Sequence, residues 1–287
     1  MPTPLFSVII PTYNRPEFLA EAVASVLCQS IADLECVVVD DASPTPVVVD
    51  PDPRVRVLRL PANGGVAAAR NAGVVAATGR YLTFLDDDDL WTPDRLEHAV
   101  EGLSRAPITV CWTRVDTEPE RGTRGRVLEG DVNGTIRDAI TPLLSVTALE
   151  RDAWVPLDER FHGAAEVEWW LRATEHATVS TVPELGCIVR RHDGVRNRND
   201  ASARIESLDL MRSLHADYFA RHRRADAFHL LRTGLVALGA GDRRRARDAL
   251  RRSFVRRPAP KTLYHLARAS LPRPMRASRS ELTRSPS

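Results

Sequence analysis

Four consecutive aspartates, Asp86 to Asp89, directly follow the apolar segment 81–85. An apolar run that ends in acids is typical of a buried strand whose carboxyl end meets a ligand. Adjacent carboxylates repel one another unless a cation lies among them, and oxygen ligands suit Mg²⁺ or Mn²⁺. Because Mg²⁺ fills its shell with few carboxylates, water and phosphate oxygens, the cluster predicts a phosphate-bearing ligand. In the alternative interpretation the acids cap the following helix, which we expect for Asp89.

A second acidic pair, Asp40 and Asp41, ends the β-branched segment 37–39 and precedes the turn sequence Ala-Ser-Pro. The carboxyl ends of parallel strands meet at one edge of a sheet, so this pair is expected to share a crevice with Asp86 to Asp89. The alternative is that the pair only forms a turn.

Between the two acidic groups, Gly64 and Gly65 precede a helix-period segment that contains Arg70. Glycines permit the backbone to approach a ligand closely, and an arginine one turn into the helix reaches a phosphate or a base. A plain loop-to-helix junction has the same pattern. The segment therefore indicates a ligand site only in combination with the two acidic groups on either side of it.

The elements that position these residues alternate between strand and helix patterns. Strands are predicted over 6–10, 35–39, 54–58 and 80–85, and helices from Pro16, over 65–77 and from Pro93, with Thr92 as the cap of the last. This alternation predicts an α/β fold with a mainly parallel sheet and helices on both faces. Further along, we expect a loop or edge hairpin over 115–135, a helix over 165–176, short strands over 178–182 and 186–190, and only helices after Ser202.

Four segments together resemble the family 2 glycosyltransferases of the GT-A fold in order and spacing: 7–14 (SVIIPTYN), 39–43 (VDDAS), 63–73 (NGGVAAARNAG) and 79–91 (GRYLTFLDDDDLW). A looser similarity extends to about residue 200. The resemblance implies a Rossmann-like GT-A sheet and inverting, metal-dependent transfer of a sugar from a nucleotide sugar, with Mn²⁺ or Mg²⁺ as cofactor.

The resemblance also implies a role for each matched residue. A nucleotide pocket is implied for Pro11, Thr12, Tyr13, Asp41, Arg70 and Asp87. Within this pocket, Asp41 accepts the imide N–H of uracil or thymine, and Arg70 lies near the base or the phosphates. Asp86 and Asp88 match the acidic metal-binding motif, with Asp88 as the direct ligand and Asp87 as a substitute for Asp86. His192 matches a histidine near the metal and the pyrophosphate, although a surface or packing role is the alternative.

The catalytic base of the family lies in an acidic pair before a tryptophan-rich stretch that ends in Leu-Arg. Here the stretch is 165–172 (AEVEWWLR), so Glu166 takes the place of the base and Ala165 replaces its acidic neighbour. Glu168 is the competing candidate. It lies about 200° from Glu166 around a helix, so both cannot face one cleft. Trp91, Trp169 and Trp170 are candidates for stacking on sugars, with core packing expected for at least one.

Charge divides the chain unevenly. Residues 1–203 carry 20 arginines against 31 acids, net −11, whereas residues 204–287 carry 20 Lys and Arg against 7 acids, net +13. We expect a catalytic domain over 1–203, a basic helical extension over 204–275 with one tetratricopeptide-like hairpin near 225–258, and a disordered tail over 276–287. The basic extension has three interpretations: a solvated face, a surface that docks on the acidic core, or attraction to anionic lipid, which we prefer.

Several classes of protein are disfavoured. The cysteines at 28, 36, 111 and 187 lack zinc or redox spacing, and no apolar run is long enough to span a membrane, which favours a cytoplasmic protein. The chain has neither a dinucleotide fingerprint nor a phosphate loop, and the basic stretch lacks a nucleic-acid motif. The sequence therefore predicts transfer of one sugar from a UDP- or dTDP-sugar to a saccharide or lipid-linked acceptor in envelope, polysaccharide or glycolipid synthesis. A nucleotide-sugar-binding protein with weak or lost transferase activity is the alternative.

Overall fold

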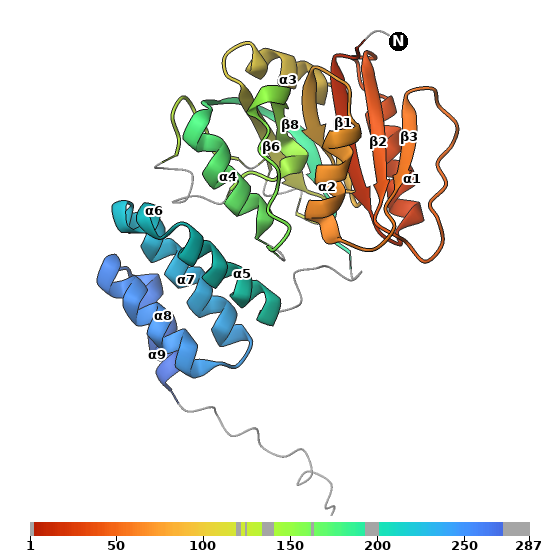
Figure 1. Cartoon of the computed structure of the whole chain (residues 1–287). Coiled ribbons are helices and arrows are strands. Elements are labelled where there is room, and N and C mark those ends of the chain that lie inside the picture. The colour runs from red at the N-terminus through yellow and green to blue at the C-terminus, as the bar shows by residue number, and fades with distance from the viewer. Residues whose placement is uncertain are drawn as a thin grey trace, which may run out of the picture. The chain divides into compact units, whose positions relative to one another are not determined.

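The strand-forming segments of the chain assemble into one mixed sheet (Figure 1). The computed structural model describes residues 3–118, 122–123, 125–133, 141–161, 164–192 and 201–271. Within these ranges the sheet has eight strands in the order β3-β2-β1-β4-β7-β6-β8-β5. Their bounds are β1 Phe6–Thr12, β2 Leu34–Asp40, β3 Val55–Arg59, β4 Tyr81–Phe84, β5 Asp89–Trp91, β6 Ile108–Val115, β7 Thr147–Glu150 and β8 Val179–Val189.

The predicted parallel arrangement holds for the first half of the sheet. Strands β3, β2, β1 and β4 are parallel neighbours, and Thr12 of β1 is in register with Asp40 of β2. The carboxyl ends of these strands therefore lie at one edge. The second half is mixed, because β7 runs antiparallel to both β4 and β6 while β8 is parallel to β6.

Helices cover both faces of the sheet, as the alternation predicts. The helices of the chain are α1 Pro16–Leu27, α2 Gly65–Ala76, α3 Arg95–Leu103, α4 Ala165–His176, α5 Ala201–Leu214, α6 Ala216–Arg221, α7 Arg223–Gly239, α8 Arg243–Arg256 and α9 Pro260–Ser270. Alternate residues of β1 point to opposite sides: Val8 and Ile10 pack with α1 and α3, whereas Ile9 packs with α2 and α4. This period of two fixes which helices share each face.

Three local expectations are wrong. Helix α3 begins at Arg95, and the hydroxyl of Thr92 donates to the carbonyl of Leu185 instead of capping the helix. Asp89 is the first residue of β5 and not a helix cap. The two short strands expected after residue 178 form one continuous strand, β8, which bends along β6 with register shifts. Sheet pairing overrides the local turn signals at these places.

The chain divides into two compact units, Met1–Ala225 and Asp226–Ser287. Helices α5 and α6 group with the first unit, and the boundary expected at residue 203 stays a prediction. Helix α7 begins at Arg223 and runs into the second unit, where a turn with Gly241 at φ +84° connects it to α8; the tetratricopeptide-like hairpin stays a prediction. The tail predicted to be disordered, 276–287, and part of the 115–135 loop lie outside the described residues.

Candidate active site

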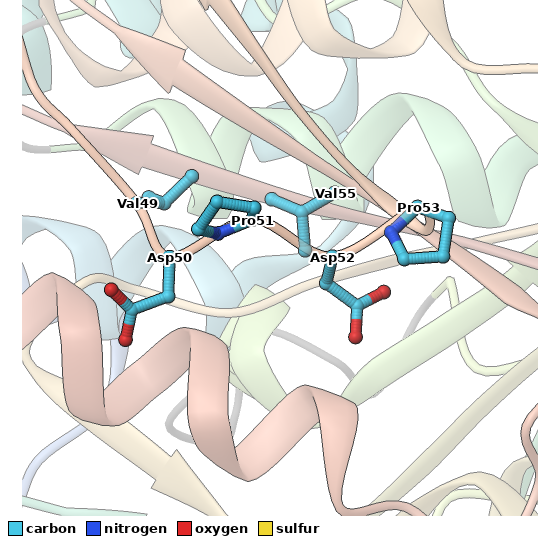
Figure 2. Close-up of a pocket in the computed structure, with 6 residues that line it drawn as sticks. All are labelled: Val49, Asp50, Pro51, Asp52, Pro53 and Val55. Carbon is cyan, nitrogen blue, oxygen red and sulfur yellow. The ribbon is translucent and has the colours of Figure 1, made fainter.

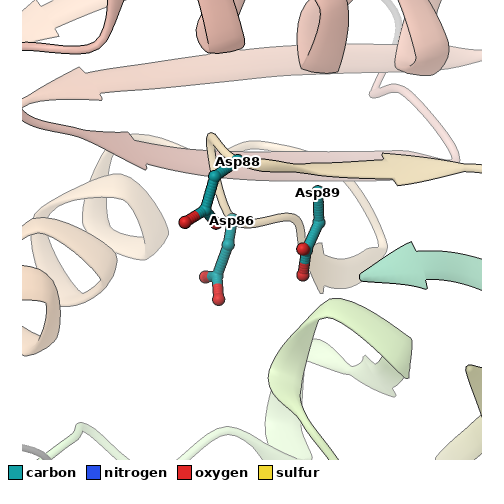
Figure 3. Close-up of side chains that lie close together, drawn as sticks. All are labelled: Asp86, Asp88 and Asp89. Carbon is teal, nitrogen blue, oxygen red and sulfur yellow. The ribbon is translucent and has the colours of Figure 1, made fainter. Parts of the chain in front are cut away.

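Three carboxylates meet where β4 ends. Buried Phe84 and Leu85 hold the end of the strand in the core, and the chain then turns into β5. Asp86, Asp88 and Asp89 each offer one carboxylate oxygen, and these atoms lie within 4.8 Å of one another. Figure 3 shows the three side chains projecting into the same space. We name them the carboxylate cluster; an all-oxygen set of this size fits Mg²⁺ or Mn²⁺.

Burial makes this concentration of negative charge costly. Burial, together with the charges of Asp86 and Asp88, raises the pKa of Asp89 to about 8. Burial also raises the pKa of Asp87 to about 6, although Thr12 and Arg15 act in the opposite direction. A bound cation would relieve both effects, since a nearby positive charge favours the ionised form of a carboxyl group.

Arg70 connects the carboxylate cluster to Glu166. Its guanidinium, 2% exposed, donates from Nη2 to Asp86 Oδ1 at 2.5 Å and from Nη1 to Glu166 Oε1 at 2.9 Å. Burial alone would lower the pKa of Arg70, but the charges of Asp86 and Glu166 raise it above its usual value. The guanidinium therefore bridges, as a permanent cation, two candidate site residues that lie 80 positions apart in the sequence.

Arg15, His192 and Thr12 contact the next two aspartates, Asp87 and Asp88. Arg15, which directly precedes α1, donates from Nη1 to Asp87 Oδ1 and Asp88 Oδ2, both at 3.0 Å. His192 Nε2 lies 2.9 Å from Asp88 Oδ2. Asp87 Oδ2 accepts from the hydroxyl of Thr12 at 2.7 Å. Asp87 thus ties the end of β1 to the turn after β4, while Asp88 is held between Arg15 and His192.

Sequence reasoning did not identify Arg15 and Arg190 as site residues. Arg190 donates from Nε to the carbonyl of Asp88 at 2.7 Å, and its guanidinium lies 4.8 Å from the centre of the Phe18 ring. The His192 ring lies 4.6 Å from the same phenylalanine ring. Arg15 directly follows the segment 7–14, and Arg190 lies two residues before His192. This proximity in the sequence is the signal by which both arginines could have been found.

The predicted nucleotide side of the site forms at the ends of β1 and β2. Asp41 accepts hydrogen bonds from the amides of Gly64 and Gly65, each at 2.8 Å, and so joins the end of β2 to the start of α2. Ala42 and Asn14 have φ of +58° and +55°. Such backbone is costly for residues other than glycine and gathers at functional sites.

The residues predicted to line the nucleotide pocket differ in exposure. Pro11 and Thr12 are buried within β1, and the Thr12 hydroxyl is already hydrogen bonded to Asp87. Tyr13, the next residue, is 46% exposed. Of these three side chains, the tyrosine ring offers the most free surface for stacking on a ligand.

The structure separates the two glutamates at the start of α4. Glu168 is 2% exposed and accepts two hydrogen bonds from Arg172 at 2.7 Å and one from His215 at 3.0 Å. Burial acts to raise its pKa, but hydrogen bonds from His215 and Arg172 lower it below the usual value. Glu166, on the other side of the helix, is 24% exposed and points toward Arg70. Glu168 therefore joins α4 to the helices that follow, whereas Glu166 lies beside Arg70 at the candidate site.

The three tryptophans proposed for sugar stacking lie in the core. Trp91, Trp169 and Trp170 are at most 4% exposed. Their indole N–H groups donate to the carbonyls of Ser145, Val155 and Pro142 at 2.8 to 2.9 Å. The expectation of core packing is confirmed for all three, because burial leaves them no face for a sugar.

A shallow pocket of about 500 Å³ lies elsewhere, in the loop before β3 (Figure 2). It is lined by Val49, Asp50, Pro51, Asp52, Pro53 and Val55. This loop enters β3 at its amino end, opposite the carboxyl ends that bear the aspartates. Prolines that flank an edge strand are a common protection against pairing with other chains, and we assign the pocket no catalytic role.

The chain is similar to a known family of proteins. Residues 7–149 match the family described as Glycosyl transferase family 2. The succinoglycan biosynthesis protein ExoO of Rhizobium meliloti is 38% identical over 117 residues, which are 39% of this chain and 34% of that protein. The chain spans half or less of the length of the first curated relatives that it matches.

Two solved structures share the fold. S. aureus TarS 1-349 in complex with UDP-GlcNAc superimposes with a TM-score of 0.61 at 18% identity, over 92% of this chain and 79% of that one. The mannosyltransferase PcManGT from Pyrobaculum calidifontis, in complex with GDP-Man and Mn²⁺, gives 0.58 at 19% identity, over 93% and 79%. The chain has a GT-A fold, and its residues 7–149 form a domain of glycosyl transferase family 2.

Proposed function

We propose that the protein is an inverting glycosyltransferase that moves one sugar from a nucleoside diphosphate sugar to an acceptor hydroxyl. The observation that carries the proposal is the connection from the carboxylate cluster through Arg70 to Glu166, at 2.5 and 2.9 Å. It supports a site with a diphosphate-binding side and a proton-accepting side. Both neighbouring structures described above contain a nucleotide sugar, UDP-GlcNAc in one and GDP-Man in the other.

On the donor side, we propose that Asp88 and Asp86 hold Mn²⁺ or Mg²⁺, with Asp89 and His192 beside them. When bound, the cation supplies charge that neutralises the departing diphosphate. Arg15 and Arg70 pair with Asp88 and Asp86 and hold these carboxylates in place beside the proposed cation. The Mn²⁺ in the PcManGT structure supports this choice of ion.

On the nucleotide side, we propose that Asp41, Tyr13 and the backbone after Pro11 and Thr12 receive the base, with Asp87 and Arg70 bracing the pocket. Each Asp41 oxygen accepts one amide hydrogen bond, and a carboxylate oxygen can accept another from an imide N–H. A UDP- or dTDP-sugar is therefore the proposed donor.

On the acceptor side, we propose Glu166 as the base. Its carboxylate takes the proton of the acceptor hydroxyl while that oxygen bonds to the anomeric carbon and the bond to the diphosphate oxygen breaks on the opposite face. A single displacement inverts the anomeric centre. Arg70 orients Glu166 through the 2.9 Å hydrogen bond, whereas the buried pairing of Glu168 with Arg172 leaves that residue no free approach to an acceptor.

The acceptor is proposed to be a saccharide or a lipid-linked saccharide in polysaccharide, cell-envelope or glycolipid synthesis. The similarity to ExoO, named for succinoglycan biosynthesis, supports this class. Among the described residues, no helix is both long and apolar enough to cross a bilayer. We propose a cytoplasmic protein that associates peripherally with the inner face of the membrane through its basic extension.

Replacement of Glu166 by Gln tests the proposal most directly. We expect kcat to fall by about two to four orders of magnitude, the usual range for loss of a general base, with nucleotide binding retained. The exposed Glu175→Gln, on the same helix, is the matched control and should behave as the natural protein. The measurement is transfer or hydrolysis of candidate donors with Mn²⁺.

Two results would change the assignment. Near-normal turnover by Glu166→Gln would exclude this residue as the base. Metal-dependent binding of a donor without any turnover by the natural protein would favour the alternative function, a nucleotide-sugar-binding protein with weak or lost activity.

A further inference from the structure

Helix α9 and the residue that follows it expose large apolar side chains on the outside of the second unit. Leu263, Tyr264 and Leu271 are 52%, 60% and 61% exposed, and Ala267 is exposed beside them. Positions 263, 264 and 267 lie on one side of the helix, and Leu271 is the extended cap residue that directly follows it, so the four residues make an apolar stripe that ends just beyond the helix. We name this stripe the α9 outer face.

The fully buried residues on the inner side of the same helix are small. Thr262 and Ala269 are its buried positions. A helix that is stabilised mainly by its own core turns its leucines inward, because burial of apolar surface is the main favourable term. In α9 only Leu266 is half-buried, while Leu263 and Tyr264 stay exposed, which indicates apolar surroundings outside this unit.

Positive charge borders the α9 outer face. Lys261 and Arg268 are exposed on one flank of the stripe, and the Arg268 guanidinium lies 5.8 Å from the centre of the Tyr264 ring. On the neighbouring helix α8, three arginines spaced along one face are also exposed: Arg244, Arg247 and Arg251. Residues 226–271 carry eleven Lys and Arg against three Asp, a net charge of +8. An apolar stripe with an amphipathic aromatic residue and a basic border matches the chemistry of an anionic lipid surface.

We propose that α9 lies in the headgroup region of an anionic membrane, with the α9 outer face toward the acyl chains and Lys261 and Arg268 at the lipid phosphates. The charge selects lipid over an apolar protein surface, because anionic headgroups complement the basic border along its whole length. The proposal refines the membrane association proposed above and rests on it for its place in the reaction. In this proposal α9 supplies the apolar contacts with the membrane. Basic residues alone would bind the membrane weakly and in a salt-sensitive way.

Sedimentation of the full chain with vesicles tests the proposal. We expect binding to vesicles of mixed phosphatidylcholine and phosphatidylglycerol, little binding to phosphatidylcholine alone, and weaker binding as salt rises. Leu263→Ser with Leu271→Ser should lower the partition coefficient about tenfold, because two exposed leucines lose their acyl contacts. Lys261→Glu with Arg268→Glu should lower it at least as much. The control, Val48→Ser with Val75→Ser, removes valines that are 87% and 88% exposed on the first unit and should bind normally.

Several outcomes would overturn the proposal: absence of binding to the anionic vesicles, equal binding by the leucine variant and the natural protein, or an equal loss in the valine control. If the leucine variant instead converts a dimer to a monomer in sedimentation velocity without altering vesicle binding, the stripe is a contact between copies. Protection of α9 from hydrogen exchange in the free protein, with no change on adding vesicles, would show that the chain itself covers it.

The vesicle-binding experiment can be interpreted independently of the sugar-transfer reaction. Transfer to a water-soluble acceptor, or donor hydrolysis, is measured without vesicles, and the leucine variant should keep the natural rate. Loss of vesicle binding with transfer intact overturns only the membrane inference. Vesicle binding by a protein that transfers no sugar overturns only the proposed reaction.

Discussion

Two guanidinium groups compensate the acidic side chains of the candidate site. Arg70 compensates Asp86 and Glu166 together, and Arg15 compensates Asp87 and Asp88. Buried ion pairs gain stability only when their geometry is good and their remaining polar atoms are satisfied. Arg70 meets the first condition, whereas its Nε has no hydrogen-bond partner within the described part of the chain. Arg70 therefore holds both carboxylates in place, and its removal would leave them without their cation.

Replacement of Arg70 by Met is expected to lower the free energy of unfolding by about 3 kcal/mol, because it leaves two carboxylates beside a buried apolar side chain. Mn²⁺ should restore more stability to this variant than it adds to the natural protein, since the cation then replaces the missing charge at Asp86. Urea unfolding with and without Mn²⁺ measures both effects. Arg160→Met, which removes an exposed partner of Asp158, is the control and should change little. Equal losses in the two variants would contradict the bridging role.

At the scale of elements, the carboxyl ends of β1, β2 and β4 position the site, and their amino ends carry a separate structural network. At the amino ends Glu35 of β2 accepts hydrogen bonds from the hydroxyls of Ser7 and Thr78 at 2.6 and 2.8 Å and from the amide of Gly79 at 3.1 Å. Burial acts to raise the pKa of Glu35, but the hydrogen bonds from Ser7 and Thr78 and the charge of Arg56 lower it to about 2. This network holds residues 78 and 79, which lead into β4. It thereby helps to position the carboxylate cluster at the other end of that strand.

Because of Glu35, the free energy of unfolding is expected to decrease as the solution becomes acidic. Its folded pKa of about 2 lies below the ordinary value of 4.5, so its contribution is complete above pH 4.5 and disappears as pH falls toward 2. Glu35→Gln should be less stable than the natural protein at pH 7, by about 1 to 2 kcal/mol once solvent screening is allowed for. The difference should shrink as the pH falls through this window, in urea unfolding at a series of pH values. A constant difference would contradict the assignment, and the exposed Glu184→Gln is the control.

Across the whole molecule, a parallel half-sheet brings three acidic or polar strand ends to one edge, while the basic residues gather in the later helices. The fold of the first unit places the proposed donor site at that edge, and the charge of residues 226–271 gives the second unit a surface of opposite sign. Attraction to an anionic surface would concentrate the protein at a lipid-linked acceptor without any change at the site.

Metal and donor are expected to stabilise the folded molecule together. A nucleotide sugar at about one hundred times its dissociation constant should add about 2.7 kcal/mol to the free energy of unfolding, with Mn²⁺ present. Chelation should remove most of this effect, and Asp88→Asn should abolish its dependence on metal. A thermal-shift screen of UDP-, dTDP- and GDP-sugars with Mn²⁺ or chelator measures it. An equal shift in chelator would show that the carboxylate cluster does not bind donor through a metal.

The sequence determined the elements and the chemistry they present. Alternating strand and helix periods located the elements that begin at Phe6, Pro16, Leu34, Gly65 and Ala165, because apolar periodicity depends only on local order. The acidic strand ends and the resemblance identify Asp86, Asp88 and Glu166 as candidates, because residue type and spacing are enough for this step.

Tertiary structure decided what each polar side chain does. Whether Glu166 or Glu168 faces the site depends on the rotation of α4 about its axis, which packing of Trp169 and Trp170 fixes and which no local pattern encodes. The pairing of Arg70 with Asp86 and Glu166, and of Arg15 with Asp87 and Asp88, joins residues that are 16 to 96 positions apart. Such contacts exist only once the sheet has brought its strand ends together, so sequence spacing could predict the edge but not the partners.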